Sequence, residues 1–169
     1  VERPYDLKRR GLVEKVGASV YDAGQIKALL ARFPIDLLQL PVNVLDQRLI
    51  VNGTLADLKR RGIEVHARSA FLQGLLLMPL AEIHPYFAPI QQQIVAYRAF
   101  IAELGLTPQE AALGFLETRD DIDVIICGVN TRQQLLELCA AARPLVEVDF
   151  SRFALTDDAM LNPSRWRLT

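Results

Sequence analysis

Short apolar runs alternate with amphipathic helical patterns along this chain. Four such runs have the composition of strands, and they lie at residues 13–20, 35–40, 63–67 and 122–126. After the first run, apolar side chains recur at helical spacing at Ile26, Leu29, Leu30 and Phe33. The pattern therefore predicts a strand followed by a helix, repeated four times, with one extra helix before the fourth strand.

Three of the predicted helices begin with residues that cap helices. Asp22 precedes Gln25 by three positions, and Thr131 precedes Gln134 by the same spacing. At this spacing the first side chain can accept a hydrogen bond from a free N–H of the first helical turn. Residues 107–110 (TPQE) combine a capping box with proline at the first helical position, and they give the clearest helix start in the sequence.

Two further helices are predicted from amphipathic patterns that end at a glycine. Thr54, with Asp57 three residues later, opens a short helix that Gly62 closes. A longer apolar pattern over residues 88–104 ends at Gly105.

The repeated units predict an α/β fold with a parallel sheet in a single domain over residues 1–169. Strands as uniformly apolar as these are expected to be covered on both faces. Two architectures remain open: a small doubly wound sheet, or half of a (β/α)8 barrel, which in full needs ~250 residues. The turn at residues 18–22 (ASVYD) lacks the glycines of a dinucleotide-binding turn, which disfavours the first.

Composition and charge narrow the functional classes. The chain has 169 residues, 51% of them hydrophobic, which excludes a disordered chain. Its 19 basic and 20 acidic residues give no electrostatic footprint for nucleic acid or an anionic membrane. The longest apolar stretch, residues 70–83, is too short and too interrupted to span a bilayer. The charged residues near the start are not those of a signal peptide, and two cysteines give no disulfide framework or metal cluster, so we expect a cytoplasmic protein.

Four segments, in order, resemble the last four strands of an aldo-keto reductase barrel. They are residues 15–19 (KVGAS), 36–43 (DLLQLPVN), 67–76 (ARSAFLQGLL) and 125–131 (IICGVNT). The third segment, together with residues 45–48 (LDQR), further resembles a bacterial subgroup of that family. The resemblance implies parallel βα units that form the C-terminal half of a TIM (β/α)8 barrel. It also implies an NAD(P)H-dependent oxidoreductase that interconverts carbonyls and alcohols without a metal.

The resemblance assigns cofactor-binding roles to residues at the strand ends. Ser19 and Gln39 match the serine and glutamine that bind the nicotinamide carboxamide. Arg68 stands where the family has an aromatic residue stacked on the nicotinamide, and as a cation at a strand end it favours an anion or acidic partner. Ser69 matches a residue beside the pyrophosphate, and Phe71 follows in the same loop.

The loop and helix start at residues 128–134 match the region that holds the adenosine phosphate. Gly128, Thr131 and Gln134 are the candidates there, although Thr131 with Gln134 also has a purely structural interpretation as a helix cap. The implied cofactor is NADP. NADPH is expected to be preferred over NADH only weakly, because Gly128 and Gln134 occupy places where the family has basic residues and Leu138 replaces an asparagine.

The family's catalytic tyrosine, lysine and aspartate lie on the first three strands of the barrel, which match nothing in this chain. We therefore expect no catalytic residue in it, and the chain alone is predicted to be inactive toward its small-molecule carbonyl substrate. An alternative is a non-catalytic scaffold or regulatory binding module with the same fold, and a third possibility is an independent open α/β domain. Half a barrel also exposes two strand edges, so we expect either the missing N-terminal half or self-association to cover them.

Two aromatic side chains are interpreted as structural. Tyr21 is expected to pack beside the site rather than to donate a proton, and His66 is expected to be a satisfied structural histidine.

Overall fold

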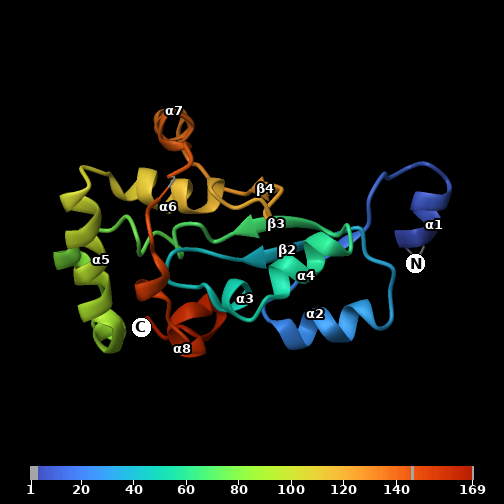
Figure 1. Cartoon of the computed structure of the whole chain (residues 1–169), viewed down its shortest axis with the longest axis horizontal. Coiled ribbons are helices and arrows are strands. Elements are labelled where there is room, and N and C mark those ends of the chain that lie inside the picture. Colours follow the sequence, from blue (N-terminus) through green and yellow to red (C-terminus); the bar gives the residue numbers. More distant parts are fainter. Residues whose placement is uncertain (1–3, 146, 169) are drawn as a thin grey trace.

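The computed structural model describes residues 4–145 and 147–168. Its centre is a parallel four-stranded sheet, with helices packed around it (Figure 1). The strands are β1 (Gly17–Ser19), β2 (Leu37–Pro41), β3 (Glu64–Arg68) and β4 (Val124–Ile125), and they lie in the order β1-β2-β3-β4. Each strand therefore pairs with the next one along the chain, as in the wall of a barrel.

Helices follow or link the strands. The α-helices are α1 (Pro4–Arg9), α2 (Ala23–Leu30), α3 (Arg48–Val51), α4 (Thr54–Arg60), α5 (Gln91–Glu103), α6 (Pro108–Glu117), α7 (Arg132–Ala141) and α8 (Asp158–Leu161). Short 3₁₀ helices are η1 (Leu80–Glu82), η2 (Pro85–Ile90), η3 (Ser151–Phe153) and η4 (Pro163–Arg165). The extra helix predicted before the fourth strand is present, since α5 and α6 both lie between β3 and β4.

Only one face of the sheet is covered by described residues. Leu38, Leu40, Val65 and Ala67 point into a core built with residues of α2, α4 and α6. Most of the alternate positions of β2 and β3, such as Gln39, remain partly exposed, while Pro41 at the end of β2 is buried. Right-handed crossovers that always advance in one direction place every helix on the same side of the sheet. The expectation that both faces are covered is therefore wrong, and the arrangement is a partial TIM barrel rather than a doubly wound sheet.

The capping predictions are confirmed at three helix starts. Asp22 Oδ1 accepts from the Gln25 N–H at 2.8 Å, and the Thr107–Glu110 capping box is formed in both directions. Thr131 caps α7 in the same way as Asp22 caps α2. These interactions are local, which is why spacing along the chain was enough to predict them.

The first strand is shorter than predicted. It is confined to Gly17–Ser19, and just before it the Val16 carbonyl accepts from the Asp36 N–H, ahead of the start of β2. The helix predicted to open at Thr54 begins at that residue, and Gly53, in a left-handed conformation with φ 75°, occupies its cap position. A glycine adopts that conformation without strain, which lets α3 and α4 follow each other directly.

A second core lies beside the sheet, where α5 meets the loop after β3 and the C-terminal segment (left in Figure 1). Tyr97 of α5 is at its centre, with its ring 5.6 Å from that of Phe153 and 6.4 Å from that of Phe150. The Tyr97 hydroxyl is buried without a hydrogen-bond partner among the described residues, and burial raises the pKa of this group. The aromatic ring, not the hydroxyl, therefore supplies the stabilisation at this position.

Replacing Tyr97 by phenylalanine is expected to leave the protein as stable or to stabilise it by about 1 kcal/mol, because a buried hydroxyl without a partner costs desolvation free energy. Urea unfolding followed by circular dichroism measures the difference. A loss of stability of similar size would mean that the hydroxyl has a partner. Tyr86→Phe is the matched control, because the Tyr86 hydroxyl donates to the Ala159 carbonyl at 3.0 Å and its removal should be mildly destabilising.

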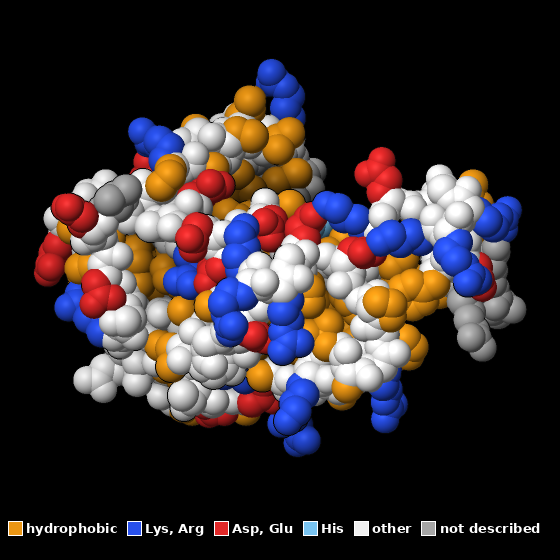
Figure 2. Space-filling model, turned by 45° about the vertical axis from the view of Figure 1, so that its right-hand side comes forward, with side chains coloured by type: hydrophobic (Ala, Val, Ile, Leu, Met, Phe, Trp, Pro, Cys, Tyr) orange, Lys and Arg blue, Asp and Glu red, His pale blue; other side chains and the backbone are white. Residues whose placement is uncertain are grey.

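The surface mixes charges of both signs. Figure 2 shows Lys and Arg side chains interleaved with Asp and Glu on the face that it presents. Several of these side chains are ion-paired, such as Lys59 with Asp123 and Arg61 with Asp57. This face therefore shows no field of a single sign that would attract a polyanion.

Candidate functional site

A cavity of about 710 Å³ lies at the carboxyl ends of β2, β3 and β4. This is the end of a parallel βα sheet at which ligands bind. Six of the eight predicted cofactor residues line it: Gln39, Arg68, Ser69, Phe71, Gly128 and Gln134. The fold thus brings together residues that are up to 95 positions apart in the sequence, counted from Gln39 to Gln134.

Ser19 and Gln39 form a polar pair beside the cavity. Ser19 on β1 is in register with Gln39 on β2, and its hydroxyl donates to Gln39 Oε1 at 3.1 Å. The Gln39 amide nitrogen donates to none of the described residues. The pair therefore offers a free amide donor and a hydroxyl acceptor side by side, which suits a carboxamide group.

Arg68 is the only lysine or arginine that lines this cavity among the described residues. Its guanidinium lies over the Tyr21 ring, with Cζ 4.4 Å from the ring centroid. Its Nη2 reaches the Val20 carbonyl and its Nη1 the Ser69 hydroxyl, each at 3.4 Å. No described carboxylate pairs with Arg68, so its charge is not neutralised. The packing role predicted for Tyr21 is confirmed.

Ser69 begins a tight loop directly after β3. Ser69, Leu72 and Gln73 all have positive φ, which is uncommon for residues other than glycine. The loop is held from below by Asn43, whose Nδ2 donates to the Ser69 carbonyl at 3.1 Å. Asn43 is fully buried, and its Oδ1 accepts from the backbone N–H groups of Leu45 and Asp46.

Asn43 is a positioning residue that lies in one of the segments with a family resemblance but has no role predicted from the sequence. Asparagine at the end of an apolar strand was the available signal, because a buried amide needs partners. Two of its partners, Leu45 and Asp46, lie two and three positions along its own loop, and the third, Ser69, lies in the loop after the neighbouring strand. The contact with Ser69 could not be read from the sequence.

Of the three residues predicted to bind the cofactor near the start of α7, two line the cavity and one does not. Gln134 lines the cavity and also accepts from the Asn130 N–H through Oε1 at 2.8 Å. Thr131 does not line the cavity, and its Oγ1 accepts from the Gln134 N–H at 3.1 Å. The helix-cap interpretation thus describes what Thr131 does in the structure. Gly128 lines the cavity with open space around it, since an added Cβ would meet nothing within 4 Å.

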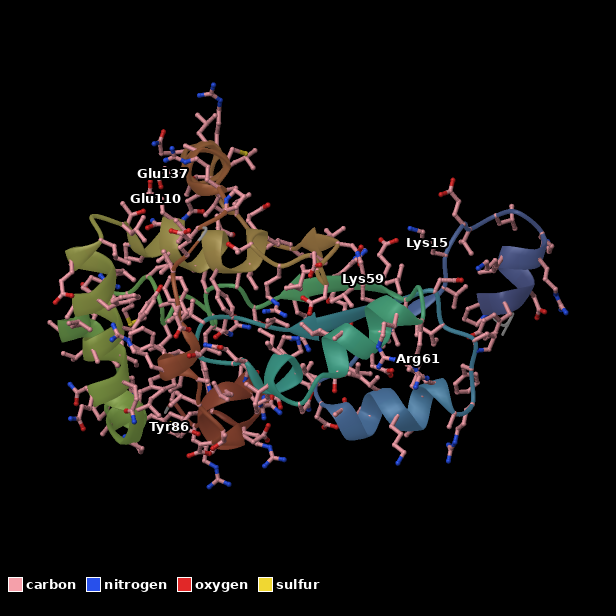
Figure 3. The ribbon with its side chains drawn as sticks, in the orientation of Figure 1. Lys15, Lys59, Arg61, Tyr86, Glu110 and Glu137 are labelled. Carbon is pink, nitrogen blue, oxygen red and sulfur yellow. The ribbon has the colours of Figure 1, made fainter. Side chains whose placement is uncertain are left out.

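Other residues that line the cavity were not predicted. Glu137 brings a carboxylate from α7, and Figure 3 shows it on the same side of the molecule as Glu110 of α6. Cys127 also lines the cavity, where burial raises the pKa of its thiol. Desolvation thus disfavours the thiolate, which is the nucleophilic form of a cysteine.

Ion pairs begin at the amino end of β3, where Glu64 is the first strand residue, and His66 lies two residues further along in register with Gln39; none of the residues that form them lines the cavity described above. Lys15 bonds to Glu64, and Glu64 Oε1 lies 2.6 Å from His66 Nε2. The Lys15 bond and then the His66 contact hold the pKa of Glu64 below its usual range. Figure 3 shows Lys15 and Lys59 near this end. His66 is a satisfied structural histidine, as predicted.

The described residues give no sign of a metal centre or a membrane span. Among residues 4–145 and 147–168, no three His, Cys, Asp or Glu side chains are grouped so that they could hold a metal ion. No helix in the described part of the chain is both long enough and apolar enough to cross a membrane.

The cavity's donor set fits part of a nicotinamide dinucleotide. The Ser19–Gln39 pair suits the carboxamide, and the Ser69 loop offers a hydroxyl and backbone groups near it. At the α7 end the lining residues Gln134, Glu137 and Leu138 include no cation. The residues therefore fit the ring and its linker, and they provide no described countercharge for a 2′-phosphate.

Comparison with known proteins identifies the class of protein that this sheet and cavity define. Residues 5–157 match the Aldo/keto reductase family. The chain therefore belongs to the aldo-keto reductase family. Comparison with curated proteins finds no match.

Solved structures of aldo-keto reductases share the fold. Aldo-keto reductase AKR11C1 from Bacillus halodurans superposes in its holo form with a TM-score of 0.65 at 20% identity, over 84% of this chain and 49% of that chain. Its apo form gives a TM-score of 0.68 at 21% identity, over 87% of this chain and 55% of that chain.

A thermostable aldo-keto reductase, Tm1743, solved with the inhibitor epalrestat, gives a TM-score of 0.60 at 18% identity, over 92% of this chain and 49% of that chain. The chain thus spans about half the length of the solved structures that it matches.

Proposed function

We propose that this chain forms the cofactor-binding half of an NAD(P)H-dependent aldo-keto reductase that interconverts carbonyls and alcohols. The observation that carries the proposal is the hydrogen-bonded pair of Ser19 and Gln39, which are in register on β1 and β2. The pair lies beside the cavity that Gln39 and Arg68 line together. Family membership supports the reaction class, and the cavity supports the role of this half.

In this proposal the Ser19 hydroxyl and the Gln39 amide bind the nicotinamide carboxamide and fix which face of the ring is presented. Ser69 lies beside the pyrophosphate, and Gly128 and Gln134 border the adenosine end. The bound cofactor supplies the hydride for the carbonyl carbon. The contribution of this chain is therefore to orient the cofactor, because two hydrogen-bonding groups on adjacent strands hold the nicotinamide ring in one pose.

The cofactor is proposed to be NADP, with NADPH preferred over NADH only weakly. Selectivity for the 2′-phosphate depends on a cation at the adenosine end, and among the described lining residues Arg68 is the only cation and lies at the strand ends instead. We propose affinities for the two reduced cofactors within about tenfold of each other.

No residue of this chain is assigned as the proton donor. Reduction needs an acid that protonates the carbonyl oxygen as the hydride arrives. We propose that the acid comes from an N-terminal barrel half that pairs with the exposed edges of β1 and β4, in the cytoplasm, and that a small carbonyl compound is the substrate. Self-association through the same edges is the alternative way to cover them.

The test is NADPH binding to the 169-residue chain, measured by the change in the fluorescence of NADPH. We expect saturable binding without carbonyl reduction, and we expect Gln39→Leu to weaken binding about tenfold by removing the amide. Gln92→Leu is the matched control, since Gln92 is exposed on α5 away from the cavity. Absence of saturable binding, or equal binding by the Gln39→Leu and Gln92→Leu variants, would contradict the proposal.

A further inference from the structure

Arg68 lies between the cavity, which it lines, and the Tyr21 ring. Arg68 lines the cavity and Tyr21 does not, while the two groups stack at 4.4 Å. The Val20 carbonyl and the Ser69 hydroxyl lie near its two terminal nitrogens. The guanidinium is thus positioned by Tyr21, Val20 and Ser69, and it lines the cavity without a carboxylate partner among the described residues.

The register of the strands places Arg68 directly beyond the Ser19–Gln39 pair. Gln39 is in register with His66, and Pro41, two residues further along β2, is in register with Arg68. Side chains two residues apart on a strand share a face and lie about 6.6 Å apart along it. A ring whose carboxamide is held at Gln39 therefore lies within reach of the Arg68 guanidinium.

We propose that Arg68 stacks on the nicotinamide ring and makes the site select the reduced cofactor over the oxidised one. The inference rests on the proposed function, because it takes the ring's position from the Ser19–Gln39 pair. The two redox forms differ at this point in charge: the ring of NADP⁺ is cationic, and the ring of NADPH is neutral.

An unneutralised guanidinium repels the cationic ring and leaves the neutral ring free to stack. At stacking distance between unit charges, the repulsion under the screening typical of a protein surface is sufficient for about a tenfold difference in affinity. A tenfold preference corresponds to a shift of about 30 mV for a two-electron couple. The site would bind NADPH readily and release NADP⁺ after hydride has left the ring.

The experiment compares dissociation constants for NADPH and NADP⁺ in three versions of the 169-residue chain. The wild type is expected to bind NADPH about tenfold more tightly than NADP⁺. Arg68→Gln keeps a planar group over Tyr21 without the charge, and it is expected to reduce this ratio to near one, mainly by tightening NADP⁺. Arg68→Lys keeps the charge without the planar stack, and it is expected to retain most of the ratio.

Each outcome separates this inference from the proposed function. If Arg68→Gln weakens both forms equally, or leaves the ratio unchanged in a protein whose thermal unfolding is normal, the inference is wrong while the cofactor site stands. If the wild type binds neither form, the proposed function fails, and the inference fails with it.

Discussion

Replacing Arg48 by methionine is expected to lower the free energy of unfolding by about 3–5 kcal/mol, because it leaves a buried carboxylate without its partner. Arg48 forms a two-pronged pair with Asp46, with Nε to Oδ1 and Nη2 to Oδ2 both at 2.8 Å. The Asp46 side chain is only 2% exposed, so water cannot replace the guanidinium. Arg48 also reaches Asp158 at 2.8 Å, and these bonds raise the pKa of Arg48 and keep it charged.

Arg165→Met is the matched control, since Arg165 pairs with the same Asp158 from the surface. The Arg165 side chain is 64% exposed, and an exposed pair contributes about 0–1 kcal/mol. Urea unfolding of both variants, followed by circular dichroism, measures the difference. Equal losses in the two variants would show that burial of Asp46 does not decide the effect.

Replacing Asn43 by alanine is expected to cost about 2–4 kcal/mol of stability and to weaken cofactor binding. The change leaves the N–H groups of Leu45 and Asp46 buried without an acceptor, and it releases the Ser69 carbonyl. Ser69 has positive φ, so its loop relaxes once that hold is lost.

Asn52→Ala serves as the control for Asn43→Ala. The Asn52 side chain also accepts from a backbone N–H two residues later, that of Thr54 at 3.0 Å, but it is exposed. Water can solvate the freed N–H there, so the expected loss is about 0.5 kcal/mol or less. Thermal unfolding and NADPH titration together test the prediction. A normal NADPH affinity in a destabilised Asn43→Ala variant would show that the Ser69 loop does not contribute to cofactor binding.

These two predictions concern neighbouring parts of the chain that support the site. Asn43 lies in the segment that connects β2 to α3, Arg48 is the first residue of α3, and Gln47 between them donates to the Phe150 carbonyl at 2.8 Å. The connection therefore ties the strand ends to the C-terminal segment. These hydrogen bonds help to fix the positions of the site residues at the ends of the short strands.

The amino-acid sequence by itself determined what depends on neighbours along the chain. The order of strands and helices follows from apolar periodicity, and the caps at Asp22, Thr107 and Thr131 follow from three-residue spacings. The family resemblance also named six of the residues that line the cavity, Gln39 and Arg68 among them, because motif order survives where overall identity is low.

Only the tertiary structure decided what depends on contacts across the sheet. The uniformly apolar strands did not reveal that helices cover one face alone, which follows from the constant direction of the crossovers. The stacking of Arg68 on Tyr21 and the support of Ser69 by Asn43 join residues 47 and 26 positions apart. Such pairs form because parallel register brings strand ends together, and no local spacing encodes that register.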